Sequence, residues 1–142
     1  MGRLDQHCVF YNALTLIRPQ KREREEIAPL LDALDLTGKQ NERISDLSGG
    51  QQQRVAVGRA LYRKAKIILG DEPVSAIDPQ QSDTVLNLLK QHAGTLVLAM
   101  HDVELALRHF DRVVGLRNGR IAYNLPRDQV TDNHLSELFS RA

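Results

Sequence analysis

Apolar positions in the first third of the chain recur at the spacing of amphipathic helices. One set precedes Pro19, which cannot continue a helix in its interior, and comprises Val9, Phe10, Leu14 and Ile17. A second set follows the charged run 21–26 and comprises Ile27, Leu30, Leu31, Leu34 and Leu36. Gly38 is placed to cap this helix, because glycine readily adopts the left-handed conformation of a helix C-terminus. The pattern predicts that residues 1 to about 46 are helical.

A further helix is predicted to begin at Ser48. Ser48 and Gln51 have the spacing of a capping box, in which each side chain accepts the other residue's backbone N–H. Gly49 and Gly50 follow the cap and leave the first N–H groups open to a second surface. Such a helix N-terminus can bind an anion such as phosphate. The apolar side of this helix is predicted to carry Val55, Gly58, Leu61 and Tyr62.

From residue 66 onward, short apolar runs replace the helical spacing. The run over 67–70 is followed by Asp71 and Glu72, and the run over 95–100 is followed by His101. Uninterrupted apolar runs of this length are typical of strands buried on both faces of a parallel sheet. Between the two runs, Asp78-Pro79 predicts a helix start with Asp78 as the N-cap.

The last third of the chain predicts a hairpin flanked by short helices. Asn118-Gly119 separates two apolar runs and favours a tight β-turn. A helix over 103–109 precedes the hairpin, and a final helix begins at Thr131 or Asp132. We predict an α/β fold, with a helical subdomain over 1–64 and an α/β core half over 65–142. The core half has a mostly parallel sheet, flanking helices and a C-terminal β-hairpin.

Composition narrows the functional classes. The chain has 142 residues and a formal net charge of +1, which gives no basic field for nucleic acid. Cys8 is the single cysteine, so an internal disulfide is excluded. The apolar runs are too short to span a membrane as helices.

Three candidate catalytic side chains follow the two predicted strands. Ligands of open α/β sheets bind at the carboxyl ends of the strands, where Asp71, Glu72 and His101 are expected. One carboxylate there can reach Mg²⁺ and the other can orient or deprotonate water, while a histidine can stabilise a phosphoryl group. Each residue also has a plainer interpretation as a solvated side chain at a strand end. Residues 75–78 likewise fit either a turn with a helix cap or a subunit-contact loop.

Four segments, taken in order, resemble the ATP-binding-cassette (ABC) ATPases. Residues 47–51 read LSGGQ and match the signature motif, and residues 67–72 match the Walker B strand. Residues 75–78 match the D-loop, with Ile77 in place of the usual leucine, and His101 matches the switch histidine. The resemblance covers about residues 25–125. The three glutamines of the signature segment, followed by Arg54, resemble importers of the phosphonate, phosphate and amino-acid branches. Residues 1–4 and the helix of residues 25–36 favour the phosphonate branch.

The resemblance implies a role for each of these residues. Asp71 would hold Mg²⁺ through water, Glu72 would be the catalytic base, and His101 would contact the γ-phosphate. Asp78 would belong to the subunit-contact D-loop. The signature residues that would contact ATP bound to the opposite subunit of a head-to-tail dimer are Ser48, Gly49, Gly50 and Gln51.

The family's second phosphate site, the G-x-x-x-x-G-K-[ST] loop, is absent from this sequence. The sole Gly-Lys pair, Gly38-Lys39, is followed by Gln40. We therefore expect the C-terminal part of a nucleotide-binding domain, without the strand that would lie in mid-sheet. Open strand edges and uncovered apolar surface recruit other chains, so the isolated chain is expected to form a homo-oligomer or swapped dimer.

Two functions from different classes remain. In the first, the chain belongs to the ATP-hydrolysing subunit of an importer, uses ATP and Mg²⁺, and is inactive alone. Its partners would be a second ATPase chain or an N-terminal half, together with transmembrane permease subunits on the cytoplasmic face of the cell membrane. In the alternative, the chain is a non-catalytic interaction or regulatory module that lends its signature motif to a partner ATPase. ATP hydrolysis by the importer subunit would depend on Glu72. Stimulation of a partner ATPase by the non-catalytic module would depend on Ser48 and not on Glu72.

Overall fold

The computed structural model describes residues 21–139, so Cys8 and the predicted helix over 9–17 lie outside the described residues. The chain divides into two compact units, Met1–Ala99 and Met100–Ala142. The first unit contains a parallel pair of strands, and the second contains an antiparallel pair. The predicted boundary between residues 64 and 65 separates a helical subdomain from an α/β core and stays a prediction.

The first described helix, α2 (Lys21–Ala33), ends earlier than predicted. The Leu36 N–H binds the Leu31 carbonyl at 2.8 Å, across a residue in the left-handed conformation. That residue is Asp35, with φ of 52°. The prediction that Gly38 caps this helix was therefore wrong, because Asp35 makes the left-handed turn. Gly38 also has a positive φ, of 85°, in the loop that follows.

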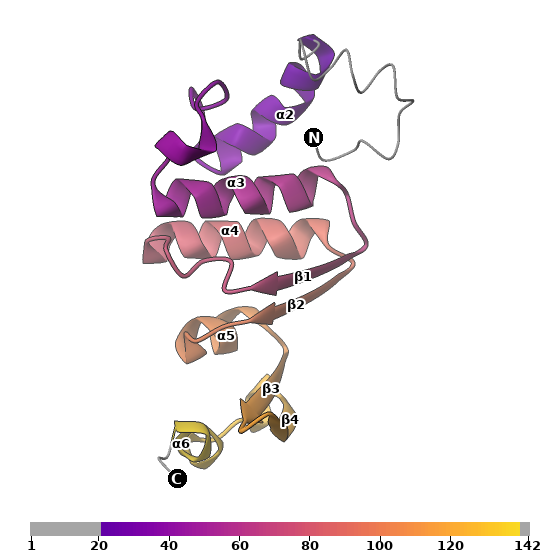
Figure 1. Cartoon of the computed structure of the whole chain (residues 1–142). Coiled ribbons are helices and arrows are strands. Elements are labelled where there is room, and N and C mark those ends of the chain that lie inside the picture. The colour runs from indigo at the N-terminus through magenta and orange to yellow at the C-terminus, as the bar shows by residue number, and fades with distance from the viewer. Residues whose placement is uncertain (1–20, 140–142) are drawn as a thin grey trace. The chain divides into compact units, whose positions relative to one another are not determined.

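Figure 1 shows α3 (Gly49–Tyr62) and α4 (Pro79–His92) running in the same direction, and the two helices pack side by side in the first unit. The short 3₁₀ helix Ile44–Asp46 precedes α3. Val57 rather than Val55 is a buried residue of α3, a shift of the predicted apolar face. A Cβ on Gly58 would lie 2.9 Å from Leu34 Cδ1, so this glycine admits a close contact. The buried side of α4 carries Ser82, Val85, Leu86 and Leu89.

The parallel pair joins β1 (Ile67–Asp71) to β2 (Thr95–Ala99), with Ile67 opposite Thr95 and Asp71 opposite Ala99. Figure 1 shows α4 running alongside this pair. Ile68 is 8% exposed, whereas Leu69 is 76% exposed. The prediction of strands buried on both faces was therefore wrong for the residues that the structure describes: one face is covered and the other is bare.

The second unit begins with α5 (Val103–His109) and continues with β3 (Arg112–Arg117) and β4 (Arg120–Pro126). These strands pair antiparallel across a turn in which Asn118 and Gly119 have φ of 50° and 72°. Positive φ at both positions is the requirement of a type I′ turn, so the predicted hairpin is confirmed. The 3₁₀ helix Arg127–Gln129 then leads to α6 (Asp132–Phe139), which contacts β3.

The α/β class is confirmed, and the sheet predicted as mostly parallel consists, in the described residues, of two separate two-stranded sheets. No helix between residues 21 and 139 combines the length and apolar character needed to cross a bilayer.

Candidate functional site

The first element of the candidate site is the N-terminus of α3, which the predicted capping box forms. The Ser48 N–H donates to Gln51 Oε1 at 3.0 Å, and the Gln51 N–H donates to Ser48 Oγ at 3.3 Å. The first backbone bond of the helix joins the Gln52 N–H to the Ser48 carbonyl at 2.8 Å. The amides of Gly49 and Gly50 therefore precede the hydrogen-bond ladder of the helix, where N–H groups have no intrahelical acceptor. Ser48 and Gly49 are exposed, so an anion in solvent or on another protein surface can reach this turn.

The second element is the acidic pair at the carboxyl end of β1. Asp71 is exposed, and Glu72 adopts a left-handed backbone with φ of 46°. This conformation costs an L-residue about 1–2 kcal/mol. The Glu72 N–H donates to the Ala99 carbonyl at 2.9 Å, and its carbonyl accepts the Ser75 N–H at 3.2 Å. Backbone contacts thus fix the point at which the chain leaves the strand.

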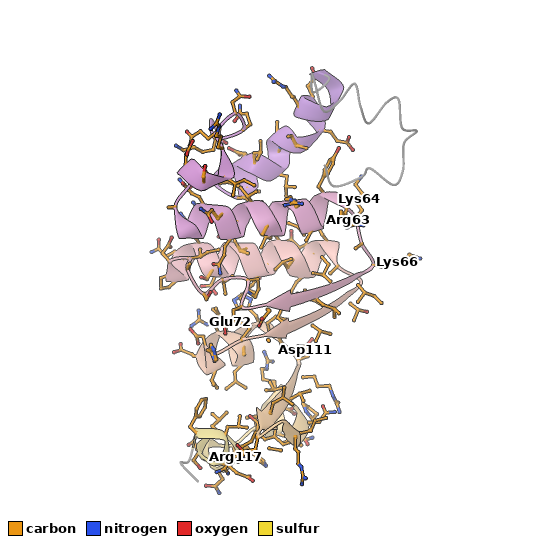
Figure 2. All side chains as sticks on the ribbon, viewed as in Figure 1. Arg63, Lys64, Lys66, Glu72, Asp111 and Arg117 are labelled. Atoms are coloured by element: carbon orange, nitrogen blue, oxygen red, sulfur yellow. The ribbon has the colours of Figure 1, made fainter. Side chains whose placement is uncertain are left out.

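Charge differs between the two ends of β1. Figure 2 shows Glu72 where β1 ends, and it shows Arg63, Lys64 and Lys66 on the connection from α3 into the strand. These three basic residues are exposed. Because β1 separates the two groups, the basic residues are not part of the acidic site.

A glutamine side chain joins the loop after β1 to α3. Gln53 Nε2 donates to the Glu72 carbonyl at 3.0 Å and to Ser75 Oγ at 2.8 Å, and Gln53 Oε1 accepts the Ala76 N–H at 2.9 Å. A Cβ on Gly50 would lie 2.6 Å from the Ala76 carbonyl oxygen, so only glycine lets the helix start lie this close. The structure therefore brings the signature residues and the Glu72 loop together. Sequence analysis missed Gln53, because nothing in a run of three glutamines marks which one reaches across the fold.

Asp78 has the structural role that its spacing predicts. Its Oδ1 accepts the Gln81 N–H at 3.0 Å and caps α4, with Pro79 in the first turn. The same Gln81 donates through Nε2 to Asp35 at 3.3 Å. The buried Arg54 guanidinium lies 3.8 Å from this Asp35 carboxylate. These contacts tie the start of α4 to α3 and to the end of α2, a cluster that sequence analysis did not predict.

His101 belongs to the second unit, where it is exposed and precedes α5. Asp102 beside it caps that helix, with its Oδ1 accepting the Leu105 N–H at 2.8 Å. The cap was predicted, whereas the placement of His101 beside Glu72 stays a prediction.

The donor set at β1 suits a magnesium ion that keeps most of its water. Across residues 21–139, no three His, Cys, Asp or Glu side chains gather into a metal-binding cluster. Mg²⁺ prefers oxygen ligands, retains several waters and commonly takes one or two carboxylates together with substrate phosphates. The exposed Asp71 carboxylate fits this mode of binding.

Comparison with known proteins gives consistent matches. The family model described as ABC transporter matches residues 1–75. The phosphonates import ATP-binding protein PhnC 1 of Pseudomonas syringae pv. tomato is 45% identical over 143 residues, which cover 98% of this chain and 53% of that protein. PhnC 1 of Pseudomonas aeruginosa is 44% identical with the same coverage. The chain spans about half the length of these relatives.

Solved structures agree with the sequence relatives. An inward-facing putative metal-chelate type ABC transporter is 28% identical with a TM-score of 0.75, covering 98% of this chain and 55% of that one. A dimeric ATP-binding cassette in a post-hydrolysis state with ADP and Pi is 33% identical with a TM-score of 0.67, covering 76% and 49%. Because the family model matches more than half of the sequence, the chain belongs to the ABC transporter family.

Proposed function

We propose that this chain forms part of the ATP-hydrolysing subunit of an ABC importer for phosphonates or related small solutes. The observation that carries the proposal is the 45% identity to PhnC 1 along 98% of the chain. The chain spans about half of that relative. We therefore assign the activity to an assembled cassette, in which the remaining part supplies the Gly-Lys-Ser/Thr phosphate loop.

In this proposal, the hydrolytic groups are Asp71 and Glu72 at the end of β1 and His101 after β2. Glu72 orients the attacking water and accepts its proton, and His101 contacts the γ-phosphate. Asp71 reaches Mg²⁺ through water. The ion, when bound, neutralises charge on the transferred phosphoryl group. The left-handed backbone of Glu72 supports this assignment, since strained residues gather at functional sites.

The start of α3 would serve a second nucleotide, bound by an opposing subunit. Its amides and the positive end of the helix dipole favour phosphate, and the four signature residues that would contact it are Ser48, Gly49, Gly50 and Gln51. Asp78, by capping α4, would keep the D-loop over residues 75–78 in place at the same subunit contact. A family structure described as a dimer with ADP and Pi supports this arrangement.

The other partners follow from the importer assignment. They are a second ATPase chain and transmembrane permease subunits, which would hold the cassette at the cytoplasmic face of the membrane. The permease, and not this chain, would select the solute.

The first test is Mg-ATP binding to the chain alone by calorimetry, with the solution mass determined on the same sample. We expect no binding at micromolar nucleotide, because the phosphate loop's amides and lysine are absent from this sequence. Micromolar binding by the chain alone would contradict the claim that a second part is needed.

The second test is complementation. The chain is co-expressed with the part of PhnC 1 that it does not match, and phosphate release is measured on the purified complex. Glu72→Gln is expected to lower kcat by about 100-fold or more, the usual contribution of a general base. Glu42→Gln is the matched control, because Glu42 is an exposed glutamate that pairs with Lys39 at 2.8 Å.

The alternative function predicts a different dependence. A non-catalytic module would raise a partner's hydrolysis through Ser48, and Glu72→Gln would leave the rate unchanged. If the folded chain assembles with the remaining part and the complex does not hydrolyse ATP, the result would contradict the enzymatic proposal.

A further inference from the structure

Gln53 is the glutamine of the signature run that reaches outside its own helix turn. Gln51 completes the capping box with Ser48, and Gln52 Nε2 donates to the Leu47 carbonyl at 2.9 Å. Gln53 instead contacts residues 19 to 23 positions further along the chain. The three neighbouring side chains therefore have three different tasks.

The contacts of Gln53 fix the orientation of its amide group. The Glu72 carbonyl can only accept a hydrogen bond and the Ala76 N–H can only donate one. The nitrogen of the Gln53 amide must therefore face Glu72 and its oxygen must face Ala76, at 3.0 and 2.9 Å. Ser75 Oγ accepts a further bond from the same nitrogen. The side chain bridges both ends of the tight turn that follows β1.

From this geometry we infer that Gln53 is a positioning residue that sets the left-handed backbone of Glu72. The Glu72 carbonyl receives two described bonds, from the Ser75 N–H within the turn and from Gln53 across the fold. Ala76, the other end of the bridge, also lies against Gly50, where a Cβ would be 2.6 Å from the carbonyl oxygen. Gln53 thus connects the phosphate-facing start of α3 to the residue proposed to orient water.

This inference rests on the proposed function for its catalytic meaning, while the positioning itself is measurable without nucleotide. In the isotope-labelled 142-residue chain, NMR reports two quantities. One is the amide exchange rate of Ala76, and the other is the three-bond HN–Hα coupling of Glu72, which depends on φ. The variants are Gln53→Met, which keeps the length and removes the amide, and Gln53→Glu, which keeps an acceptor for the Ala76 N–H. The control is Gln52→Met, because Gln52 is exposed and bonds only its own turn among the described contacts.

We expect Gln53→Met to speed Ala76 exchange by about two- to tenfold, the loss of one protecting bond, and to change the Glu72 coupling. Gln53→Glu should keep Ala76 protected and still change the Glu72 coupling, because its carboxylate cannot donate to the Glu72 carbonyl. Gln52→Met should change neither. Parent-like values of both quantities in a folded Gln53→Met chain would overturn the inference.

The complemented enzyme gives a second readout. Gln53→Met should lower kcat with KM within twofold, because the turn orients a reacting group and does not bind substrate. A shifted Glu72 coupling together with an unchanged kcat would also overturn the positioning role. If the parent complex does not hydrolyse ATP, the proposed function fails, and the NMR quantities still decide whether Gln53 sets the Glu72 backbone.

Discussion

The two faces of the β1–β2 pair carry similar apolar residues, but one face is buried and the other is exposed to solvent. Ile67 and Leu69 are 63% and 76% exposed, while Ile68 between them is 8% exposed. Val97, opposite Leu69, is 56% exposed on the same bare face. Parallel strands are normally apolar because helices cover both faces. The difference shows that this pair has the composition of a doubly covered sheet while only one of its faces is covered in the described chain.

The antiparallel pair repeats this asymmetry. Tyr123 and Gly115 face each other across the strands and are buried. A Cβ on Gly115 would lie 2.4 Å from the Tyr123 ring. The exposed large apolar residues of these strands are Val114, Leu116 and Ile121. Each two-stranded sheet therefore presents an uncovered apolar surface, of the kind that marks association sites.

The largest expected effect is on the free energy of unfolding, when two neighbouring residues on opposite faces of β1 are each truncated to alanine. Ile68→Ala should lower the free energy of unfolding by about 2–5 kcal/mol, the usual cost of emptying a core site. Leu69→Ala should lower it by less than about 1 kcal/mol, since little of that side chain is removed from water. Urea unfolding followed by circular dichroism measures both. Equal losses at the two positions would mean that the bare face is covered in solution.

The sequence predicted best the helix caps and the β-turn, which depend on residues close together in the chain. The capping box of Ser48, the cap at Asp78 and the turn at Asn118 each depend on a few consecutive side chains and backbone angles, and the structure contains all three. Gly38 was a wrong choice of cap because an aspartate, Asp35, adopts the left-handed angle. The preference of glycine for that angle is strong without being exclusive.

The sequence did not predict features that depend on contacts between distant segments of the chain. The apolar run over 67–70 indicates a strand suited to burial, and it cannot say whether both faces are covered. The contact between Gln53 and Ala76 spans 23 positions, and only the folded chain brings the two together. The pairing of motifs within the site is therefore a structural finding, while the identity of the motifs is a finding of sequence.

A second prediction concerns association through the bare face. Leu69→Thr with Val97→Thr places a strand-favouring β-branched residue at both positions and removes apolar surface. We expect the isolated parent chain to be oligomeric and the double variant to shift toward the monomer mass in analytical ultracentrifugation, with little change in unfolding free energy. Ile44→Thr is the control, because Ile44 is 53% exposed and lies outside the strands. A monomeric parent would exclude association through this face, and an unchanged double variant would assign it to other residues.

The smallest expected effect is a pH dependence at the covered face of the antiparallel pair. Burial raises the pKa of Tyr123, and its hydroxyl has no hydrogen-bond partner among the described residues. The folded state therefore favours the neutral phenol. Its contribution is fully present below the unfolded pKa, about 10, and is lost as pH rises through that value toward the raised one. Tyr123→Phe cannot ionise, so the variant should gain stability relative to the parent as the pH rises through about 10. The other tyrosines are common to both proteins and cancel in the difference. A difference that stays constant with pH would mean that the phenol is solvated in the folded chain and that this face is less covered than its neighbours indicate.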